Sequence, residues 1–290
     1  MKKLVLLSCL VTLLFSCSGG GNKPKEIGLQ LYSIRTDIKK DLDNGLKMTA
    51  DAGYTFVEAA GYKDGKFYNK TPKEFLDLCK KHGLEFISSH IVGPDPNVET
   101  PEKCKAWWDK AIAAHKEIGV AYIVQPIMSG KAFASLEGLQ KYCEFFNQVG
   151  EWCNAAGIKF GYHNHGREFK KYFDVNGQQI RVYDYMLQNT DPSKVFFQMD
   201  LYWVQVGGGN IVEYFNKYPG RFLEWHVKDE KELGASGTMD FEAMYNAAKT
   251  AGLKYQIVEQ EAFTEGKTAF QSIKESRDYL QNAPFAAAKY

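Results

Sequence analysis

The stretch from residue 195 to residue 261 begins with VFFQMDL (195–201) and ends with YQIVEQE (255–261), and between them lie IVEYFNKY (211–218), FLEWHVKD (222–229) and FEAMYNAAKTAG (241–252). Short runs of β-branched and aromatic residues alternate here with longer amphipathic runs. The short runs predict buried strands and the longer ones predict helices. Strict alternation of strand and helix indicates parallel strands joined by helical crossovers.

The same alternation extends upstream. Strands are predicted at 26–34, 55–61, 85–91, 121–127 and 158–165, and helices at 37–53, 71–83, 101–119, 135–157, 182–189 and 269–281. Eight strand–helix units in a chain of 290 residues predict an α/β protein with one domain, a single (β/α)₈ TIM barrel over residues 27–283. Neither GxGxxG nor GxxxxGK follows the first strand, so the open nucleotide-binding folds lack their usual signature.

The N-terminus has the pattern of an export signal. MKK is followed by the apolar run LVLLSCLVTLLF, and LFSC ends at Cys17. LFSC resembles the lipobox of bacterial lipoproteins, in which the cysteine is lipidated. We therefore predict a signal peptide over 1–16, a lipidated Cys17, a flexible tether over 17–26, and an exported, membrane-anchored lipoprotein that is periplasmic or associated with the outer membrane. Plain cleavage near Ser16 and an uncleaved anchor are the alternatives.

Charge and cysteine content narrow the class of protein further. Removing Lys2 and Lys3 leaves 34 basic against 35 acidic residues, and no basic patch stands out, so we expect no nucleic-acid partner. Four cysteines remain after Cys17, and their spacing matches no metal framework. Buried free thiols are the favoured interpretation, although paired cysteines would also suit an exported protein.

Polar side chains stand at the C-terminal ends of seven predicted strands. In a barrel these ends meet at one rim, where active sites are built. Side chains two positions apart on a strand point to the same side, so the two histidines of YHNH face one space. Asp, His and Glu together can bind Mn²⁺, Mg²⁺, Co²⁺ or Zn²⁺. The polar residues at the ends of the seven strands are Glu58, His90, Gln125, His163, His165, Asp200, His226, Lys228, Glu259 and Glu261.

Seven short motifs in order resemble the xylose isomerase-like TIM-barrel superfamily, which includes sugar phosphate isomerases and epimerases and inosose dehydratases. They are LQLYSIR, VEAAG, SSHI, YHNH, MDLYWV, HVKD and VEQE. The abasic-site endonucleases of this superfamily are a poorer match, because Trp203 stands where they offer a further histidine.

The resemblance implies one divalent metal ion held by the ends of the fifth to eighth strands. Family epimerases use Glu, Asp, His and Glu there. The last three match Asp200, His226 and Glu259, whereas His163 stands in the place of the first glutamate. We predict that His163 is the fourth ligand and that Glu259, His163 and Lys228 are catalytic. The predicted substrate contacts are Tyr32, Glu58, His90, Gln125, His165, Trp203 and Glu261.

The resemblance further implies a metal-dependent sugar isomerase or epimerase that removes a proton next to the carbonyl group of a keto sugar. An exported enzyme would meet few phosphorylated sugars, so the expected partner is an unphosphorylated carbohydrate. A 3-keto-glycoside lyase or hydratase, acting by β-elimination, is the alternative. A non-catalytic sugar-binding lipoprotein is the second alternative, because a fold alone does not fix a function.

Overall fold

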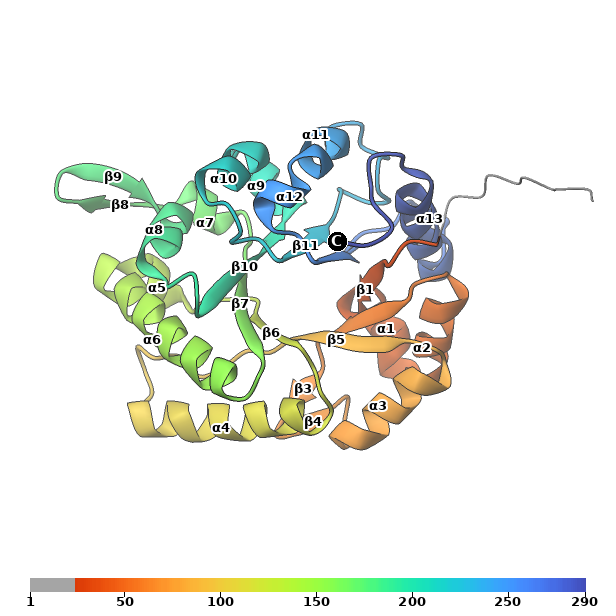
Figure 1. Cartoon of the computed structure of the whole chain (residues 1–290), viewed down its shortest axis with the longest axis horizontal. Helices are drawn as coiled ribbons and strands as arrows, with labels where there is room; N and C mark the ends of the chain where they lie inside the picture. The colour runs from red at the N-terminus through yellow and green to blue at the C-terminus, as the bar shows by residue number, and fades with distance from the viewer. Residues whose placement is uncertain (1–23) are drawn as a thin grey trace, which may run out of the picture.

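A computed structural model describes residues 24–290, and eight parallel strands close into a barrel in the order β1-β12-β11-β10-β7-β6-β5-β2 (Figure 1). The predicted (β/α)₈ barrel is confirmed. The strands are short and almost wholly buried because helices cover their outer faces. They are β1 (Gly28–Gln30), β2 (Phe56–Ala59), β5 (Glu85–His90), β6 (Tyr122–Gln125), β7 (Lys159–His163), β10 (Val195–Asp200), β11 (Glu224–Val227) and β12 (Tyr255–Val258).

Helices surround the barrel, and several strand-to-strand connections contain more than one helix. They are α1 (Arg35–Lys40), α2 (Leu42–Asp51), α3 (Pro72–Lys81), α4 (Pro101–Glu117), α5 (Gly130–Ala134), α6 (Leu136–Ala155), α7 (Arg167–Lys170), α8 (Val182–Asn189), α9 (Leu201–Val206), α10 (Ile211–Lys217), α11 (Phe241–Asn246), α12 (Ala248–Ala251) and α13 (Ala269–Asn282).

Local capping chemistry defines both ends of α3. The Thr71 hydroxyl accepts a hydrogen bond from the backbone N–H of Glu74, and the Glu74 carboxylate accepts one from the N–H of Thr71, which together form a capping box. Pro72 follows at the first helical position, and Gly83 lies just beyond the helix with φ of 72°. Glycine adopts this left-handed conformation without steric cost, so the chain can turn directly into β5.

Several element boundaries differ from the prediction. The predicted first strand stops at Gln30, because Leu31–Ile34 form a 3₁₀ helix, η1. The predicted helix 37–53 is two helices, since Asp41 leaves the helical conformation and its carboxylate caps α2 by accepting from the N–H of Asn44.

Two hairpins also lie between the predicted strands and helices, where the sequence predicted no strand. One consists of β3 (Tyr62–Lys63) and β4 (Lys66–Phe67), and the other of β8 (Tyr172–Val175) and β9 (Gln178–Arg181). The β8–β9 hairpin projects from the side of the barrel in Figure 1. Its tight turn contains Asn176 and Gly177, both with positive φ, which suits a two-residue hairpin connection.

The chain enters the barrel through a packed N-terminal segment. Lys25, at the end of the stretch predicted to be a tether, is 6% exposed, and its ammonium donates hydrogen bonds to the carbonyl oxygens of Leu280 and Ala283. The N–H of Glu26 donates to the carbonyl oxygen of Ala288 at 2.8 Å. The predictions for the signal peptide, for Cys17 and for most of the tether concern residues 1–23, which lie outside the described residues.

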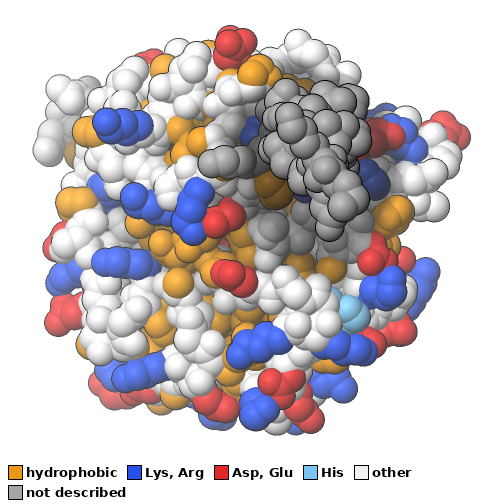
Figure 2. Space-filling view, turned by 45° about the vertical axis from the view of Figure 1, so that its right-hand side comes forward, with side chains coloured by type: hydrophobic (Ala, Val, Ile, Leu, Met, Phe, Trp, Pro, Cys, Tyr) orange, Lys and Arg blue, Asp and Glu red, His pale blue; other side chains and the backbone are white. Residues whose placement is uncertain are grey.

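The described surface carries charges of both signs. Figure 2 shows Lys and Arg interspersed with Asp and Glu on one face of the molecule. Within residues 24–290, no helix has the length and apolar character needed to cross a bilayer. The four described cysteines are buried and unpaired, in agreement with the favoured interpretation: Cys79, Cys104, Cys143 and Cys153.

Close packing of α6 on the barrel depends on a glycine. A Cβ atom at residue 150 would lie 2.3 Å from the carbonyl oxygen of Lys194, just before β10. We expect Gly150→Ala to lower the free energy of unfolding by about 1–3 kcal/mol, because the helix must move away from the backbone. Gly130→Ala, at the start of α5, is the control, since a Cβ there meets no atom within 4 Å. Denaturant titrations of both variants test this, and equal stabilities would contradict it.

Candidate functional site

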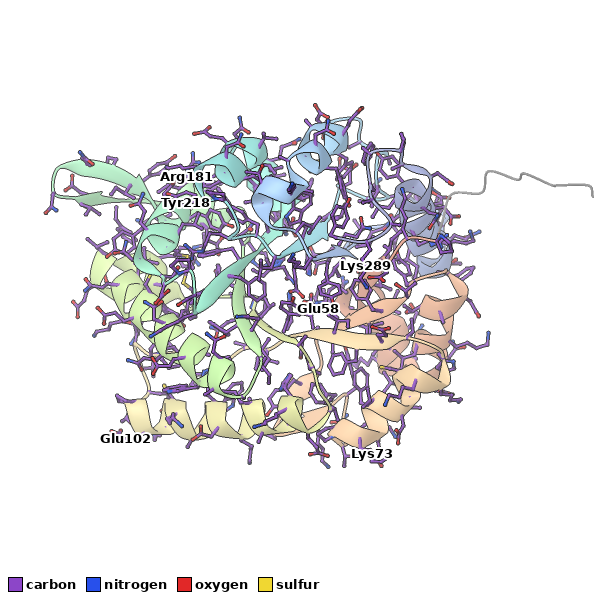
Figure 3. All side chains as sticks on the ribbon, in the orientation of Figure 1. Glu58, Lys73, Glu102, Arg181, Tyr218 and Lys289 are labelled. Atoms are coloured by element: carbon purple, nitrogen blue, oxygen red, sulfur yellow. The ribbon has the colours of Figure 1, made fainter. Side chains whose placement is uncertain are left out.

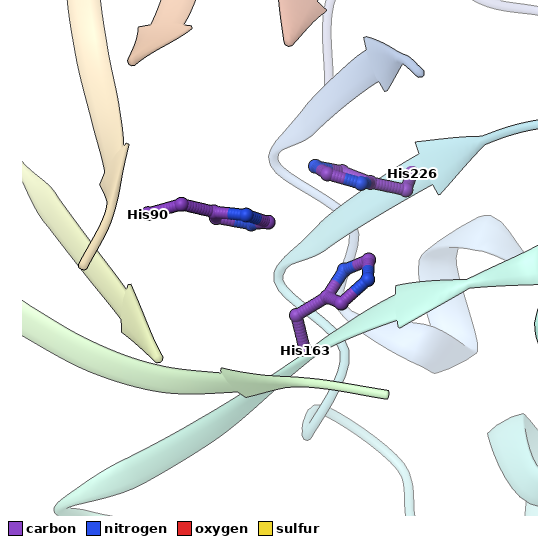
Figure 4. A group of neighbouring side chains, drawn as sticks. All are labelled: His90, His163 and His226. Atoms are coloured by element: carbon purple, nitrogen blue, oxygen red, sulfur yellow. The ribbon is translucent and has the colours of Figure 1, made fainter. Parts of the chain in front are cut away.

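Three imidazoles converge inside the barrel at the C-terminal ends of its strands. His90 ends β5, His163 ends β7 and His226 lies on β11, and Figure 4 shows the three rings close together. The ring centroids of His163 and His226 are 4.6 Å apart, and His90 lies 5.0 Å from each. All three rings are buried. A hydrogen-bonding network beneath them determines which nitrogen of each ring is free.

Glu58 on β2 lies at the centre of this network, and Figure 3 labels it inside the barrel. Its carboxylate is 0% exposed and accepts hydrogen bonds from the Gln30 amide at 2.6 Å, the Ser88 hydroxyl at 2.5 Å and the Gln198 amide at 2.7 Å. His226 Nε2 donates to Oε1 at 2.6 Å. Burial alone would raise the pKa of Glu58, but the neighbouring His90 and His226 lower it to about 2. Glu58 is therefore an ionised group enclosed by donors.

Gln198 on β10 fixes the orientation of two of the imidazoles. Its amide nitrogen donates to Glu58 and to Glu224, so its amide oxygen must face the histidines. That oxygen accepts from His90 Nε2 at 2.6 Å and from His163 Nδ1 at 3.1 Å. The hydrogen-bond pattern leaves Nε2 of His163 free, and it leaves Nδ1 of His226 as the nitrogen that could bind a cation once its proton is lost.

An ionic cluster lies next to the imidazoles. The buried ammonium of Lys228 donates to Glu259 Oε2 at 3.0 Å and to Glu261 Oε2 at 2.5 Å, and it lies 3.6 Å from Asp200 Oδ2. His163 Nε2 is 4.0 Å from Asp200 Oδ2, and His226 Nδ1 is 3.2 Å from Glu259 Oε2. Side chains from β7, β10, β11 and β12 therefore meet in one space.

The charges in this cluster depend on one another. Burial opposes a charged imidazole, but the carboxylates of Glu259 and Glu58 raise the pKa of His226 to about 10. Burial also raises the pKa of Asp200 to about 7, although Lys228 opposes that change. For Glu259, the cationic His226 and Lys228 overcome the effect of burial and hold the pKa well below its usual range.

These residues fit a divalent cation. One ligand atom from each of His163, Asp200, His226 and Glu259 can be chosen so that all four lie within 4.8 Å of one another, and all four residues are buried. Asp200 Oδ2 and His226 Nδ1 have no hydrogen-bond partner among the described residues. Buried polar atoms without partners are costly, so a ligand that binds them stabilises the site. His90, His163 and His226 form a second group that meets the same distance limit.

A pocket of about 360 Å³ opens over this cluster. Three predicted substrate contacts do not line the pocket. Glu58 is enclosed beneath it, and the Gln125 amide donates a hydrogen bond to the carbonyl oxygen of Ile127. The Trp203 ring lies 6.0 Å from the ring of His165. Asp200, His226 and Lys228 are buried beneath the residues that line the pocket. Six of the predicted residues line it: Tyr32, His90, His163, His165, Glu259 and Glu261.

Some residues of the site were missed from the sequence. Gln198 and Glu224 each stand two positions before a predicted site residue on the same strand, so the alternation of a strand would have placed them inside the barrel. Glu168 on α7 was also missed. It is 2% exposed, accepts a hydrogen bond from the Tyr162 hydroxyl and another from the N–H of His165 at 3.1 Å, and so holds the turn that carries His165.

A family model for the xylose isomerase-like TIM barrel matches residues 46–283. The chain belongs to this family. A crystal structure of a sugar phosphate isomerase/epimerase from Parabacteroides distasonis ATCC 8503 is 35% identical, with a TM-score of 0.83 over 94% of this chain and 98% of that one. The chain is also similar to inosose dehydratases.

Two inosose dehydratases illustrate this second similarity. The enzyme from Clostridium beijerinckii is 25% identical over 211 residues, and the match spans 64% of this chain and 65% of the enzyme. The enzyme from Lacticaseibacillus casei is 21% identical over 302 residues, which cover 88% of this chain and 96% of the enzyme. The relatives of the chain thus include a protein named sugar phosphate isomerase/epimerase and enzymes named inosose dehydratase.

Asp200 offers a direct test of the metal site. Its Oδ1 accepts from the N–H of Trp203 and caps α9, whereas Oδ2 is the atom without a partner. Asp200→Asn keeps the cap but removes the anionic ligand, so we expect Mn²⁺ affinity to fall at least about a hundredfold with little loss of folding. Calorimetric Mn²⁺ titration measures this.

The control is Asp240→Asn, because Asp240 caps α11 in the same way. Unchanged Mn²⁺ affinity in Asp200→Asn would remove Asp200 from the metal site.

Glu168 makes the stability of the protein depend on pH. Burial raises the pKa of Glu168 to about 7, from an ordinary value of 4.5, so folding favours the protonated carboxyl. The stability that it contributes is therefore present below pH 4.5 and is lost as the pH rises through 7. We expect the wild type to lose about 2 kcal/mol of unfolding free energy between pH 5 and pH 8 relative to Glu168→Gln. Denaturant titrations of both proteins at the two pH values measure this. Equal changes in unfolding free energy for the wild type and Glu168→Gln would refute the prediction.

Proposed function

We propose that the protein is a divalent-metal-dependent enzyme that removes the proton next to the carbonyl group of a carbohydrate ketone and then expels the substituent on the following carbon. This reaction is a β-elimination, as carried out by a lyase or dehydratase. The isomerase or epimerase predicted from the sequence shares the first step. The similarity to enzymes named inosose dehydratase and sugar phosphate isomerase/epimerase supports a reaction of this class.

Glu259 is the proposed base. It lines the pocket, and its depressed pKa keeps it ionised at neutral pH. Its Oε2 is bound by Lys228, while Oε1 accepts no hydrogen bond within the described part of the chain. A carboxylate with one oxygen held and the other free has a fixed direction from which to accept a proton.

One observation favours elimination over epimerisation, and it concerns His163. A glutamate at this place could bind a cation through one oxygen and move a proton with the other. His163 has only Nε2 available, because its Nδ1–H is donated to Gln198. It can ligate a cation or accept a proton, but not both. Epimerisation needs proton transfer on both faces of the substrate, whereas elimination needs a single base.

Lys228 is the proposed acid. Its ammonium is buried, and burial opposes its charge, but the carboxylates of Asp200, Glu259 and Glu261 raise its pKa. In the elimination, Glu259 takes the proton from the carbon next to the carbonyl. The electrons of that C–H bond first form the enolate, and they then form the new C=C bond as the C–O bond on the following carbon breaks. The departing oxygen takes its proton from Lys228.

His163, Asp200, His226 and Glu259 would hold the cation, and Mn²⁺, Mg²⁺, Co²⁺ and Zn²⁺ all suit this set of donors. When bound, such an ion supplies charge stabilisation for the developing enolate oxygen. We propose a small unphosphorylated carbohydrate as the substrate. Export and lipid anchoring through Cys17 stay predictions from the sequence.

The test follows the α-proton and the leaving group separately. Protein with Mn²⁺ is incubated in D₂O with a keto sugar, an inosose and methyl 3-keto-β-D-glucopyranoside, and NMR records deuterium uptake and methanol or water release. We expect release from at least one substrate, and Glu259→Gln should abolish both deuterium uptake and release. Lys228→Met should slow release about a hundredfold or more while deuterium uptake persists.

The other outcomes identify the alternatives. Deuterium uptake that produces a new isomer or epimer without release would establish the isomerase predicted from the sequence. Sugar binding without any uptake would favour the non-catalytic binding protein. Equal loss of uptake and release in Lys228→Met would remove Lys228 from the role of acid.

A further inference from the structure

The pocket has two chemically different sides. The ionisable groups are Glu259 and Glu261 after β12, His163 and His165 at the end of β7, and His90 at the end of β5. The large apolar side chains of the lining form another side, which comes from the segments after four neighbouring strands, β1, β2, β5 and β6. We call it the apolar wall, and it consists of Tyr32, Tyr62, Ile91, Val92, Pro126 and Ile127.

The apolar wall is open to solvent. Tyr32 is 43% exposed, Val92 is 58% exposed and Ile127 is 50% exposed, and these are three of the six large hydrophobic side chains that the described surface exposes. Half of the most exposed apolar groups therefore gather at the mouth of one pocket. Clustering of this kind is typical of a ligand site.

Phosphate has no evident partner in this pocket. Among the described residues that line it there is no Lys or Arg, whereas two carboxylates are present. The Lys228 ammonium is engaged by Glu259 and Glu261. Arg35 lies over the Tyr32 ring and donates to the Tyr32 carbonyl oxygen, outside the lining. A phosphorylated sugar would instead call for Arg, Lys or a helix N-terminus aimed at the ligand.

The pocket is also larger than one sugar ring requires. An apolar cavity of about 150 Å³ is enough to hold a benzene ring. The pocket of about 360 Å³ therefore has room for a sugar ring and a second ring of similar size. A ligand with its sugar ring over the polar side would extend any apolar substituent along the wall.

We propose that the substrate is an unphosphorylated carbohydrate ketone that carries an apolar, ring-sized substituent, and that the wall formed by Tyr32, Tyr62, Ile91, Val92, Pro126 and Ile127 binds this substituent. The inference rests on the proposed function for the position of the sugar ring. The wall sets the preference among substrates, while the ionisable side sets the reaction.

Binding to the Glu259→Gln variant tests the wall without interference from catalysis, with Mn²⁺ raised to a concentration that saturates this variant, because Glu259 is also a proposed metal ligand. Calorimetry compares methyl and phenyl 3-keto-β-D-glucopyranoside, and we expect the phenyl compound to bind about ten- to thirtyfold more tightly. Adding Val92→Asn or Ile127→Asn should reduce this ratio below about threefold and leave the affinity for the methyl compound unchanged. Val98→Asn is the control, because Val98 is 60% exposed but does not line the pocket.

Two results would overturn the inference. One is equal affinity for the phenyl and methyl compounds, and the other is tenfold tighter binding of the 6-phosphate of 3-keto-glucose than of 3-keto-glucose. Failure of the proposed function is a separate result, since it means that the unmodified enzyme releases no leaving group from any ketone. An active enzyme that binds the phenyl and methyl compounds with equal affinity would refute only the proposed role of the apolar wall.

Discussion

The buried charge of Glu58 is the constraint on which the site depends. A carboxylate fully removed from water is tolerated only when donors surround it. The donors come from Gln30 on β1, Ser88 on β5, Gln198 on β10 and His226 on β11, so one side chain on β2 ties together strands from around the barrel. The interior therefore holds a polar network where many barrels of this kind hold branched apolar residues.

This constraint reaches the reacting groups through three hydrogen bonds. Glu58 takes the Nε2–H of His226 and orients the Gln198 amide, and Gln198 in turn takes the Nδ1–H of His163. The nitrogens of His163 and His226 therefore have defined roles before any ligand arrives. Preorganisation of this kind spares the site from reorganising during the reaction.

Much of the fold could be predicted from the sequence, because alternation of buried strands and amphipathic helices is a local pattern. Convergence of His163, Asp200, His226 and Glu259 could be predicted as well, since the ends of parallel strands share one rim. The role of Glu58 beneath the pocket could not, because it depends on how far inside the barrel the residue lies. Of the apolar wall, only Tyr32 was predicted to contact the substrate, because apolar side chains at the ends of strands look the same in the sequence as ordinary core residues.

The two ends of the described chain lie side by side. The hydrogen bond from Glu26 to Ala288 and the contacts of Lys25 with the end of α13 are made where the chain enters β1, at the N-terminal ends of the strands. The pocket opens at the other end of the barrel. A fused protein or a solid support joined at this point would leave the pocket unobstructed. The adjacent ends could also be linked and the chain reopened in an outer connection, a rearrangement that compact domains with neighbouring termini tolerate.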